Sequence, residues 1–113
     1  MSEHCLFCRI VRGEIPANIV AESADALAFR DIAPQAPVHV LVIPRVHYAS
    51  LSETPDGAVM AAVSELAKRV ARELGVDATG YRLVVNTGAD GGQTVHHLHA
   101  HLLAGRQMDW PPG

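Results

Sequence analysis

Residues 97–103 read His-Leu-His-Ala-His-Leu-Leu, a run in which an imidazole alternates with an apolar side chain. Successive side chains of a β-strand point to opposite faces, so this run predicts a strand with His97, His99 and His101 on one face. At a rise of about 3.3 Å per residue, the three imidazoles would follow one another at about 6.6 Å. A purely structural strand would rarely carry three polar rings on one face, and the run therefore indicates a functional site.

Two kinds of chemistry use histidines in such a row. In the first, the histidines bind a metal, but three imidazoles spread over roughly 13 Å of strand cannot all bind one ion at Zn–N distances near 2.0 Å. In the second, imidazoles donate hydrogen bonds to a phosphate and one of them attacks phosphorus. The loop before the run favours the second, because backbone N–H groups around Gly91 and Gly92, with the side chains of Gln93 and Thr94, could bind phosphate oxygens.

The sequence on either side of the run predicts an α+β fold. Apolar spacing followed by a glycine predicts a short helix over residues 6–12. The stretch Thr54-Pro55-Asp56 is a helix-start signal, and apolar residues recur on one face from there to Gly75, which predicts one long helix. Apolar and β-branched runs predict the other strands, over residues 18–21, 26–31, 38–43 and 81–86. Because strands and helices do not alternate regularly, we expect a mostly antiparallel five-stranded sheet.

The composition is that of one ordinary globular domain. Of the 113 residues, 49% are hydrophobic and 19% are charged, which excludes a disordered polyelectrolyte. The net charge is −3 and Lys68 is the single lysine, so we expect no nucleic-acid partner bound through clustered positive charge. No apolar run approaches about 18 residues and the first residues do not resemble a signal peptide, so we expect a cytoplasmic protein without a membrane partner.

The two cysteines, Cys5 and Cys8, are spaced Cys-x-x-Cys near the start of the chain. This spacing is typical of a metal site or a redox pair rather than of a structural disulfide framework. A tetrahedral zinc site needs four ligands, so the pair offers one half of such a site. The other half would have to come from histidines elsewhere in the fold.

The run at residues 97–103 also resembles the signature of the histidine triad (HIT) family, in which three histidines alternate with apolar residues. The likeness covers essentially the whole chain and is closest to the histidine triad nucleotide-binding (Hint) branch. It is carried by residues 14–17, 29–37, 42–44, Asn86, residues 90–93 and the ending Gly105–Gly113. The resemblance implies a single HIT domain over residues 1–113 with a HIT-like fold, and a homodimer whose two sheets run together.

The activity that the resemblance implies is that of a purine nucleoside phosphoramidase. Such an enzyme hydrolyses the P–N bond of adenosine or guanosine 5′-monophosphoramidates through a covalent nucleotidyl-histidine, releasing a nucleoside monophosphate and an amine. Its ligands are purine nucleoside monophosphates and their phosphoramidates. A nucleotide-binding regulatory or scaffold protein with incidental catalysis is the alternative.

The resemblance also implies roles for single residues. His99 corresponds to the nucleophile, His101 to a phosphate-contacting histidine and His39 to a histidine that supports the triad. The remaining matched positions are Asn86, Gly92, Gln93 and Thr94 around the phosphate, Asp31 on the ribose hydroxyls, Ile32, Phe7, Ile10 and Leu41 around the base, and Trp110 on the leaving-group side. Thr94, His39 and His101 are all candidates for protonating the leaving amine.

Two of these positions also have a plainer interpretation. Asp31 could cap a turn before Pro34, and Trp110 could merely anchor the end of the chain.

In some members of the wider histidine triad superfamily, a Cys-x-x-Cys pair binds zinc together with a histidine after the third strand and the first triad histidine. Those positions are His47 and His97 here, so the resemblance implies structural zinc bound by Cys5, Cys8, His47 and His97. Ligation by His96 and His4, or two reduced thiols without metal, are the alternatives.

Overall fold

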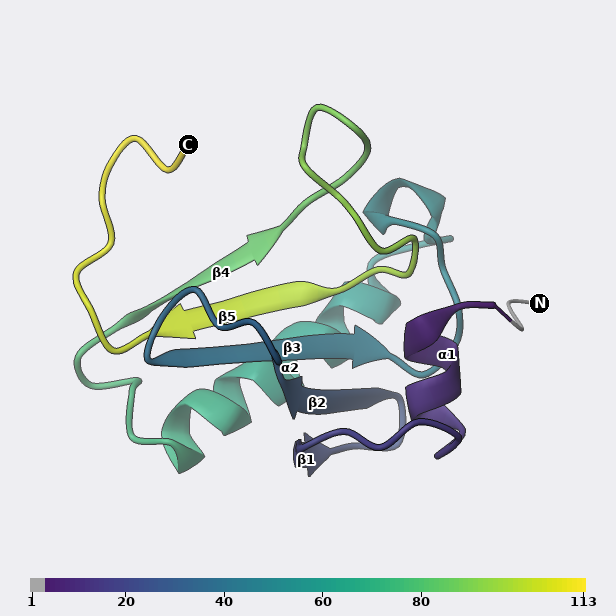
Figure 1. Cartoon of the computed structure of the whole chain (residues 1–113), viewed down its shortest axis with the longest axis horizontal. Helices are drawn as coiled ribbons and strands as arrows, with labels where there is room; N and C mark the ends of the chain where they lie inside the picture. The colour runs from purple at the N-terminus through teal and green to yellow at the C-terminus, as the bar shows by residue number, and fades with distance from the viewer. Residues whose placement is uncertain (1–3) are drawn as a thin grey trace.

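A computed structural model describes residues 4–113, in which an antiparallel sheet lies between a short and a long helix (Figure 1). The helices are α1 (Leu6–Val11) and α2 (Ala58–Glu73), and the strands are β1 (Ile19–Glu22), β2 (Ala26–Arg30), β3 (Val38–Pro44), β4 (Tyr81–Val85) and β5 (Ala100–Ala104). The strand order is β1-β2-β3-β5-β4, and all neighbouring strands are antiparallel. The predicted α+β fold is therefore confirmed, while residues 1–3 of the predicted domain lie outside the described residues.

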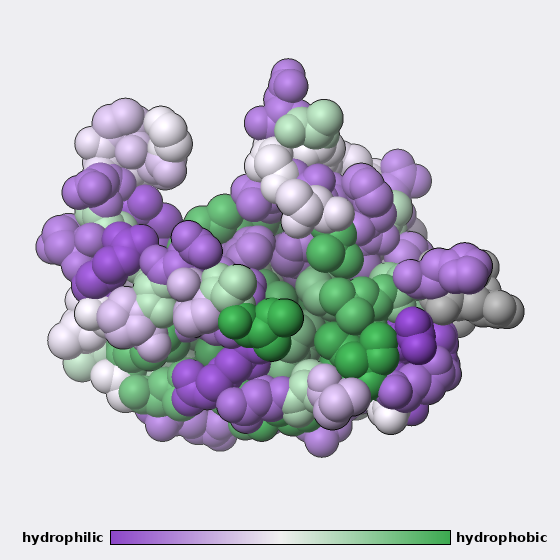
Figure 2. All heavy atoms as spheres, in the orientation of Figure 1, coloured by the Kyte–Doolittle hydropathy of each residue, from purple (hydrophilic) through white to green (hydrophobic). Residues whose placement is uncertain are grey.

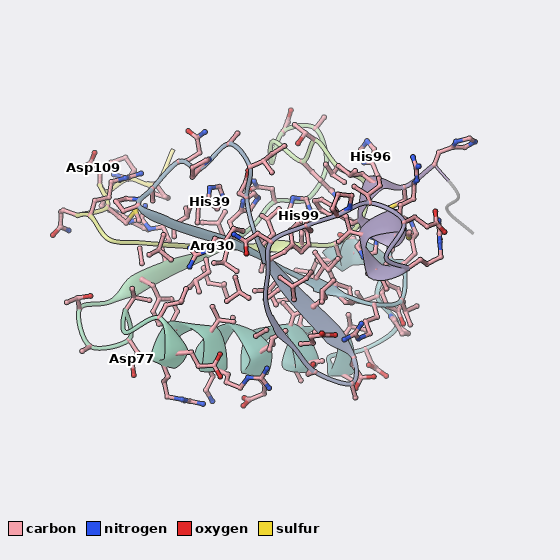
Figure 3. All side chains as sticks on the ribbon, turned by 60° about the horizontal axis from the view of Figure 1, so that its bottom comes forward. Arg30, His39, Asp77, His96, His99 and Asp109 are labelled. Atoms are coloured by element: carbon pink, nitrogen blue, oxygen red, sulfur yellow. The ribbon has the colours of Figure 1, made fainter. Side chains whose placement is uncertain are left out.

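The sheet has two differently covered faces. Alternate residues of the central strands, among them Val40 and Leu102, pack against α2 in the main core. The residues between them face the other way, where α1 covers one end of the sheet with Phe7, whose ring lies edge-on to that of Phe29 at 5.5 Å. The rest of this second face carries the histidines, on the side of the sheet away from α2 (Figure 3).

The predicted strand over residues 97–103 is wrong in its extent, because β5 begins at Ala100. Ala100 pairs with both Val42 and Val85, whereas the three residues before it lie outside the sheet ladder. Leu98 donates its N–H instead to the Tyr48 carbonyl at 2.7 Å. Residues 97–99 are therefore hydrogen-bonded to the segment after β3 and not to a neighbouring strand, and the three histidines do not form one evenly spaced row.

The long helix starts later than its start signal predicts. Thr54 does not cap it, because the Thr54 hydroxyl donates to the Leu51 carbonyl at 2.8 Å and closes a 3-10 turn over Leu51–Glu53. Asp56 accepts the N–H of Ala58 at 2.9 Å instead, and α2 begins there. From that point its many alanine, leucine, glutamate and arginine residues favour a helix. Neither helix within residues 4–113 has the length and apolar character that crossing a membrane requires.

Candidate functional site

Two of the three histidines of the run belong to two separate clusters on the face opposite α2, and the third lies between these clusters. His97 is fully buried next to α1, and His101 lies in β5, paired in register with Leu41 of β3. His99 lies between the two clusters, with its ring centroid 4.9 Å from that of His101 and 5.2 Å from that of Phe7. His96 is exposed and belongs to neither cluster.

The first cluster brings together the four predicted metal ligands, Cys5, Cys8, His47 and His97. Their ligand atoms all lie within 4.8 Å of one another. His97 Nδ1 is 3.4 Å from Cys5 Sγ, 3.5 Å from Cys8 Sγ and 3.2 Å from His47 Nδ1, and Cys8 Sγ is 3.3 Å from His47 Nδ1. Tetrahedral zinc with two sulfur and two nitrogen ligands needs separations of about 3.3 to 3.8 Å. The cluster is therefore able to hold a metal ion with little rearrangement.

The protonation of His97 fits the same interpretation. His97 Nε2 is 2.9 Å from the Pro44 carbonyl, which can only accept, so the neutral ring carries its proton on Nε2. Nδ1 then has a lone pair directed at the two sulfurs and at His47. A metal-bound histidine typically donates its other N–H to a carbonyl in this way. Two thiols and two imidazoles form the donor set of a structural zinc site.

A backbone carbonyl also holds the ring of His99, but the bond is made by Nδ1, whereas in His97 it is made by Nε2. Its Nδ1 lies 2.7 Å from the His97 carbonyl, so Nδ1 carries the proton and Nε2 carries the lone pair in the neutral ring. The residue is 5% exposed, and its ring packs edge-on against Phe7. A buried imidazole with a fixed tautomer and one available lone pair is suited to act as a nucleophile.

The second cluster is a chain of hydrogen bonds through His39 and His101. The backbone N–H of Gln35 donates to His39 Nδ1 at 3.0 Å, so the proton of the neutral His39 ring is on Nε2. That Nε2 is 3.0 Å from His101 Nδ1 and 3.4 Å from an Asp31 carboxylate oxygen. His101 therefore accepts at Nδ1 and keeps its own proton on Nε2, where it can donate to an anion.

Asp31, His39 and His101 also lie close enough together to hold a metal, with their ligand atoms within 4.8 Å. Their hydrogen bonds do not suit that use. Because Gln35 donates to His39 Nδ1, a metal on Nε2 would require the ring to lose its last proton. We therefore assign this cluster to hydrogen bonding rather than to metal binding.

The pKa of His101 is lowered to about 4, mainly by burial and also by the neighbouring His99 and His39, while Asp31 opposes the shift. Since its folded pKa is below the unfolded value near 6.5, the folded state prefers the neutral ring. That contribution to stability is complete above about pH 6.5 and is lost as the pH falls toward 4.

The His101→Asn variant is therefore expected to lose less stability than the wild type between pH 7 and pH 5, by about 1–2 kcal/mol. Urea unfolding at the two pH values measures this difference. His96→Asn, which changes an exposed histidine nearby, should follow the wild type. Equal acid losses for His101→Asn and His96→Asn would show that His101 does not titrate in this way.

Two groups of the predicted phosphate cradle in the loop before β5 form hydrogen bonds within the protein. Gly92 donates its N–H to the Ala89 carbonyl at 3.0 Å, so this group is used within the turn. The side-chain amide of Gln93 donates to the carbonyls of Ala49 and Val95 and accepts from the Gly88 N–H. Both groups are thus used within the loop when no ligand is bound, and phosphate binding by Gly92 and Gln93 stays a prediction. A Cβ on Gly91 would lie 2.4 Å from the Thr87 carbonyl oxygen, so the turn requires glycine there.

The other predicted nucleotide contacts lie in different surroundings. Phe7 and Leu41 are buried in the small core under α1, and Ile10 is partly buried against it. Ile32 is completely exposed. Two polar positions, Asn86 and Thr94, flank the loop, the first partly buried and the second exposed.

Asp31 makes the predicted turn-capping contact and a second contact, with His39, that was not predicted. One carboxylate oxygen accepts the Ala33 N–H at 2.8 Å, which is the turn-capping contact. The other faces His39 Nε2. The capping role therefore does not remove Asp31 from the histidine cluster.

The end of the chain forms one wall of a cleft beside the histidine face. The cleft has a volume of about 570 Å³, and its lining includes Asn86, Arg82 and Arg106. Figure 2 shows the hollow between the C-terminal tail and the loop that precedes β5. Trp110 is 82% exposed, and its ring is not among the residues that line this cleft.

Several groups at the site were not predicted from the sequence. Arg82 could have been found, because strand alternation places it on the same face as Asn86. The Gln35 N–H and the Pro44 and Tyr48 carbonyls are backbone groups, and no side-chain pattern identifies them.

Comparison with known proteins places this site in a family. Residues 12–108 match the family model described as HIT domain. A HIT family hydrolase from Legionella pneumophila has a TM-score of 0.94 at 51% identity, covering 97% of this chain and 100% of that one. A histidine triad nucleotide-binding protein from Candida albicans has a TM-score of 0.83 at 34% identity, over 95% and 82% of the chains. The 14 kDa zinc-binding protein of Zea mays is 45% identical over 96% of this chain and 87% of its own. This chain belongs to the HIT domain family.

Proposed function

We propose that this protein is a purine nucleoside phosphoramidase of the Hint branch, with His99 as its nucleophile. The observation that carries the proposal is the fixed tautomer of His99, whose Nδ1–H donates to the His97 carbonyl. This leaves Nε2 as the attacking atom. The neighbouring His101 has its proton on Nε2 and can donate to a phosphoryl oxygen. The names of the Legionella hydrolase and the Candida nucleotide-binding protein agree with this activity.

The reaction takes place in two displacements at phosphorus. The Nε2 lone pair of His99 forms an N–P bond while the P–N bond of the substrate breaks, and its electron pair leaves with the amine, which gains a proton. Water then attacks phosphorus, the electron pair of the N–P bond returns to Nε2, and the proton that the water loses replaces the one that was given to the amine. The products are an amine and a nucleoside monophosphate. The lowered pKa values of His39 and His101 favour neutral rings at neutral pH, and each neutral ring has one N–H, on Nε2. Thr94, His39 and His101 are the candidates for supplying the proton.

We propose that zinc is the metal of the Cys–His cluster and that its role is structural. Cys5, Cys8, His47 and His97 would hold it, and all four positions of a tetrahedral ion would be filled by protein. The ion would link α1 to the segment after β3, which contains His47, and to the residues before β5, which include His97. Thiol ligands persist in a reducing compartment, which agrees with a cytoplasmic protein.

The activity is tested by incubating the purified protein with adenosine and guanosine 5′-phosphoramidates and measuring release of the monophosphate. Many turnovers per chain are expected. Binding of nucleoside monophosphates without turnover of either phosphoramidate would favour the alternative, a nucleotide-binding regulatory or scaffold protein.

Asp31→Asn is expected to raise KM for adenosine phosphoramidate by about tenfold with little change in kcat. The amide oxygen can still accept the Ala33 N–H, but the charged hydrogen bonds to the ribose hydroxyls are lost, and such bonds contribute about 1.5–3 kcal/mol. Asp56→Asn is the matched control, because Asp56 also caps a backbone N–H but lies at the start of α2. An unchanged KM in Asp31→Asn would leave Asp31 with its turn role alone.

We further propose a homodimer in which β4 pairs with its copy. β4 is an edge strand of the sheet, and its Tyr81 and Leu83 are 39% and 36% exposed. An unpaired edge with apolar side chains favours pairing with another chain. Pairing there would bring the exposed Trp110 toward the partner's site. Sedimentation velocity should give a dimer mass, and a monomer mass would contradict this arrangement.

A further inference from the structure

We infer that His97 couples metal occupancy of the Cys–His cluster to the state of the nucleophile His99. His97 would then be a positioning residue, and metal loading would control the activity. The inference rests on the proposed function, since it concerns the same nucleophile and the same metal.

The first link is His97 itself, which takes part in both sites through different atoms. Its Nδ1 lies among the sulfurs and His47 Nδ1 of the cluster. Its carbonyl oxygen accepts the Nδ1–H of His99 at 2.7 Å. A shift of residue His97 as a whole would therefore move the carbonyl that accepts the His99 Nδ1–H.

The second link is Phe7, which lies between the two cysteines in the sequence. Its ring is edge-on to His97 at a centroid distance of 5.9 Å and edge-on to His99 at 5.2 Å. Because Cys5 caps α1 by accepting the Cys8 N–H, the helix start and Phe7 are held together with the ligands. Loss of the metal would loosen a ring that packs directly on the nucleophile.

The third link is the segment that follows β3. Tyr48 accepts the Leu98 N–H at 2.7 Å, and its neighbour His47 is a cluster ligand. Residues 97–99 lie outside the β5 ladder, so this bond and the side-chain contacts of His97 hold them. The position of the His97 carbonyl thus depends on the cluster together with the bond from the His97 ring to Pro44 of β3, and not on the β5 ladder.

Without a metal, the four ligand atoms of the cluster stay together only if protons lie between them. If His97 has its proton on Nε2, a lone pair on its Nδ1 faces His47 Nδ1 at 3.2 Å and both sulfurs within 3.5 Å. These electron-rich atoms separate unless a metal or a proton lies between them. Separation would leave the His99 Nδ1–H without its acceptor. The ring would then populate both tautomers, and only one of them presents Nε2 as a nucleophile.

The inference is tested on four proteins, each supplied with one equivalent of zinc: wild type, His47→Ala, His47→Cys and His96→Ala. Nitrogen NMR of the histidine rings at one alkaline pH reports the His99 tautomer without any substrate. Wild type and His96→Ala should show one tautomer, with the proton on Nδ1. His47→Ala should show a mixture and a kcat lower by on the order of tenfold, with KM little changed. His47→Cys keeps four ligands and should restore both readouts.

The wild type freed of metal is the second comparison, in case His47→Ala does not fold. A mixture of tautomers in the folded, metal-free wild type supports the coupling. One unchanged His99 tautomer in every folded sample overturns it, even if kcat falls. Unfolding of both His47→Ala and the metal-free protein also overturns it, because the metal would then act on the whole fold. Absence of phosphoramidate turnover in all four proteins would instead overturn the proposed function and leave the tautomer result intact.

Discussion

The His99→Asn variant is expected to lose phosphoramidate hydrolysis by on the order of 10⁴-fold, because it lacks the atom that we propose forms the bond to phosphorus. Asparagine can still donate from its side-chain amide to the His97 carbonyl, so the local packing beside Phe7 should persist. Steady-state release of adenosine monophosphate measures the loss. In the wild type, acid-quenched single turnovers should yield protein that carries one nucleotidyl group, and His99→Asn should not form this adduct.

Two matched variants separate a nucleophile from a general disturbance of the site. His101→Asn removes a hydrogen-bond donor to the phosphate, and a loss of about 10²-fold is expected, with the covalent adduct still formed. His96→Ala changes an exposed histidine next in sequence to His97 and should keep full activity. If His99→Asn retained more activity than His101→Asn, the assignment of His99 as the nucleophile would be wrong.

The fold could be predicted from the sequence because its strands follow the period of two. In β3, Val40 and Val42 enter the main core while His39 and Leu41 face the other side, as the alternation requires. The hairpin of β1 and β2 and the extent of α1 agree with their patterns within a residue. In these elements local periodicity and tertiary packing point to the same structure.

The parts that could not be predicted depend on contacts between distant backbone groups. The alternation of histidine and apolar residues begins at His97, which predicts a strand from that residue onward. A hydrogen bond from the Leu98 N–H to the Tyr48 carbonyl instead holds residues 97–99 outside the sheet. Gln93 has the side chain of a phosphate ligand and uses it to hold its own loop. Alternation along one strand cannot indicate which of its polar groups another segment has already bound.

Removal of zinc is expected to lower the midpoint of thermal unfolding by about 15 °C. A ligand present at 1,000 times its Kd stabilises the folded state by about 4.1 kcal/mol, and each kcal/mol shifts the midpoint of a domain of this size by about 4 °C. The effect should be this large because the four ligands come from α1, the segment after β3 and the residue run before β5, which the metal ties together. Scanning calorimetry with and without a chelator measures the shift.

Ligand variants then distinguish the proposed set from its alternatives. Cys8→Ala should abolish stoichiometric zinc in elemental analysis and unfold near the temperature of the chelated wild type, because a buried ligand from α1 is gone. His4→Ala changes an exposed histidine next to Cys5 and should keep one zinc per chain and the wild-type midpoint. If His4→Ala lost zinc and His47→Ala kept it, His4 rather than His47 would be the ligand. A midpoint that chelation leaves unchanged would contradict a structural metal at this cluster, because an ion bound only to the folded state must stabilise that state.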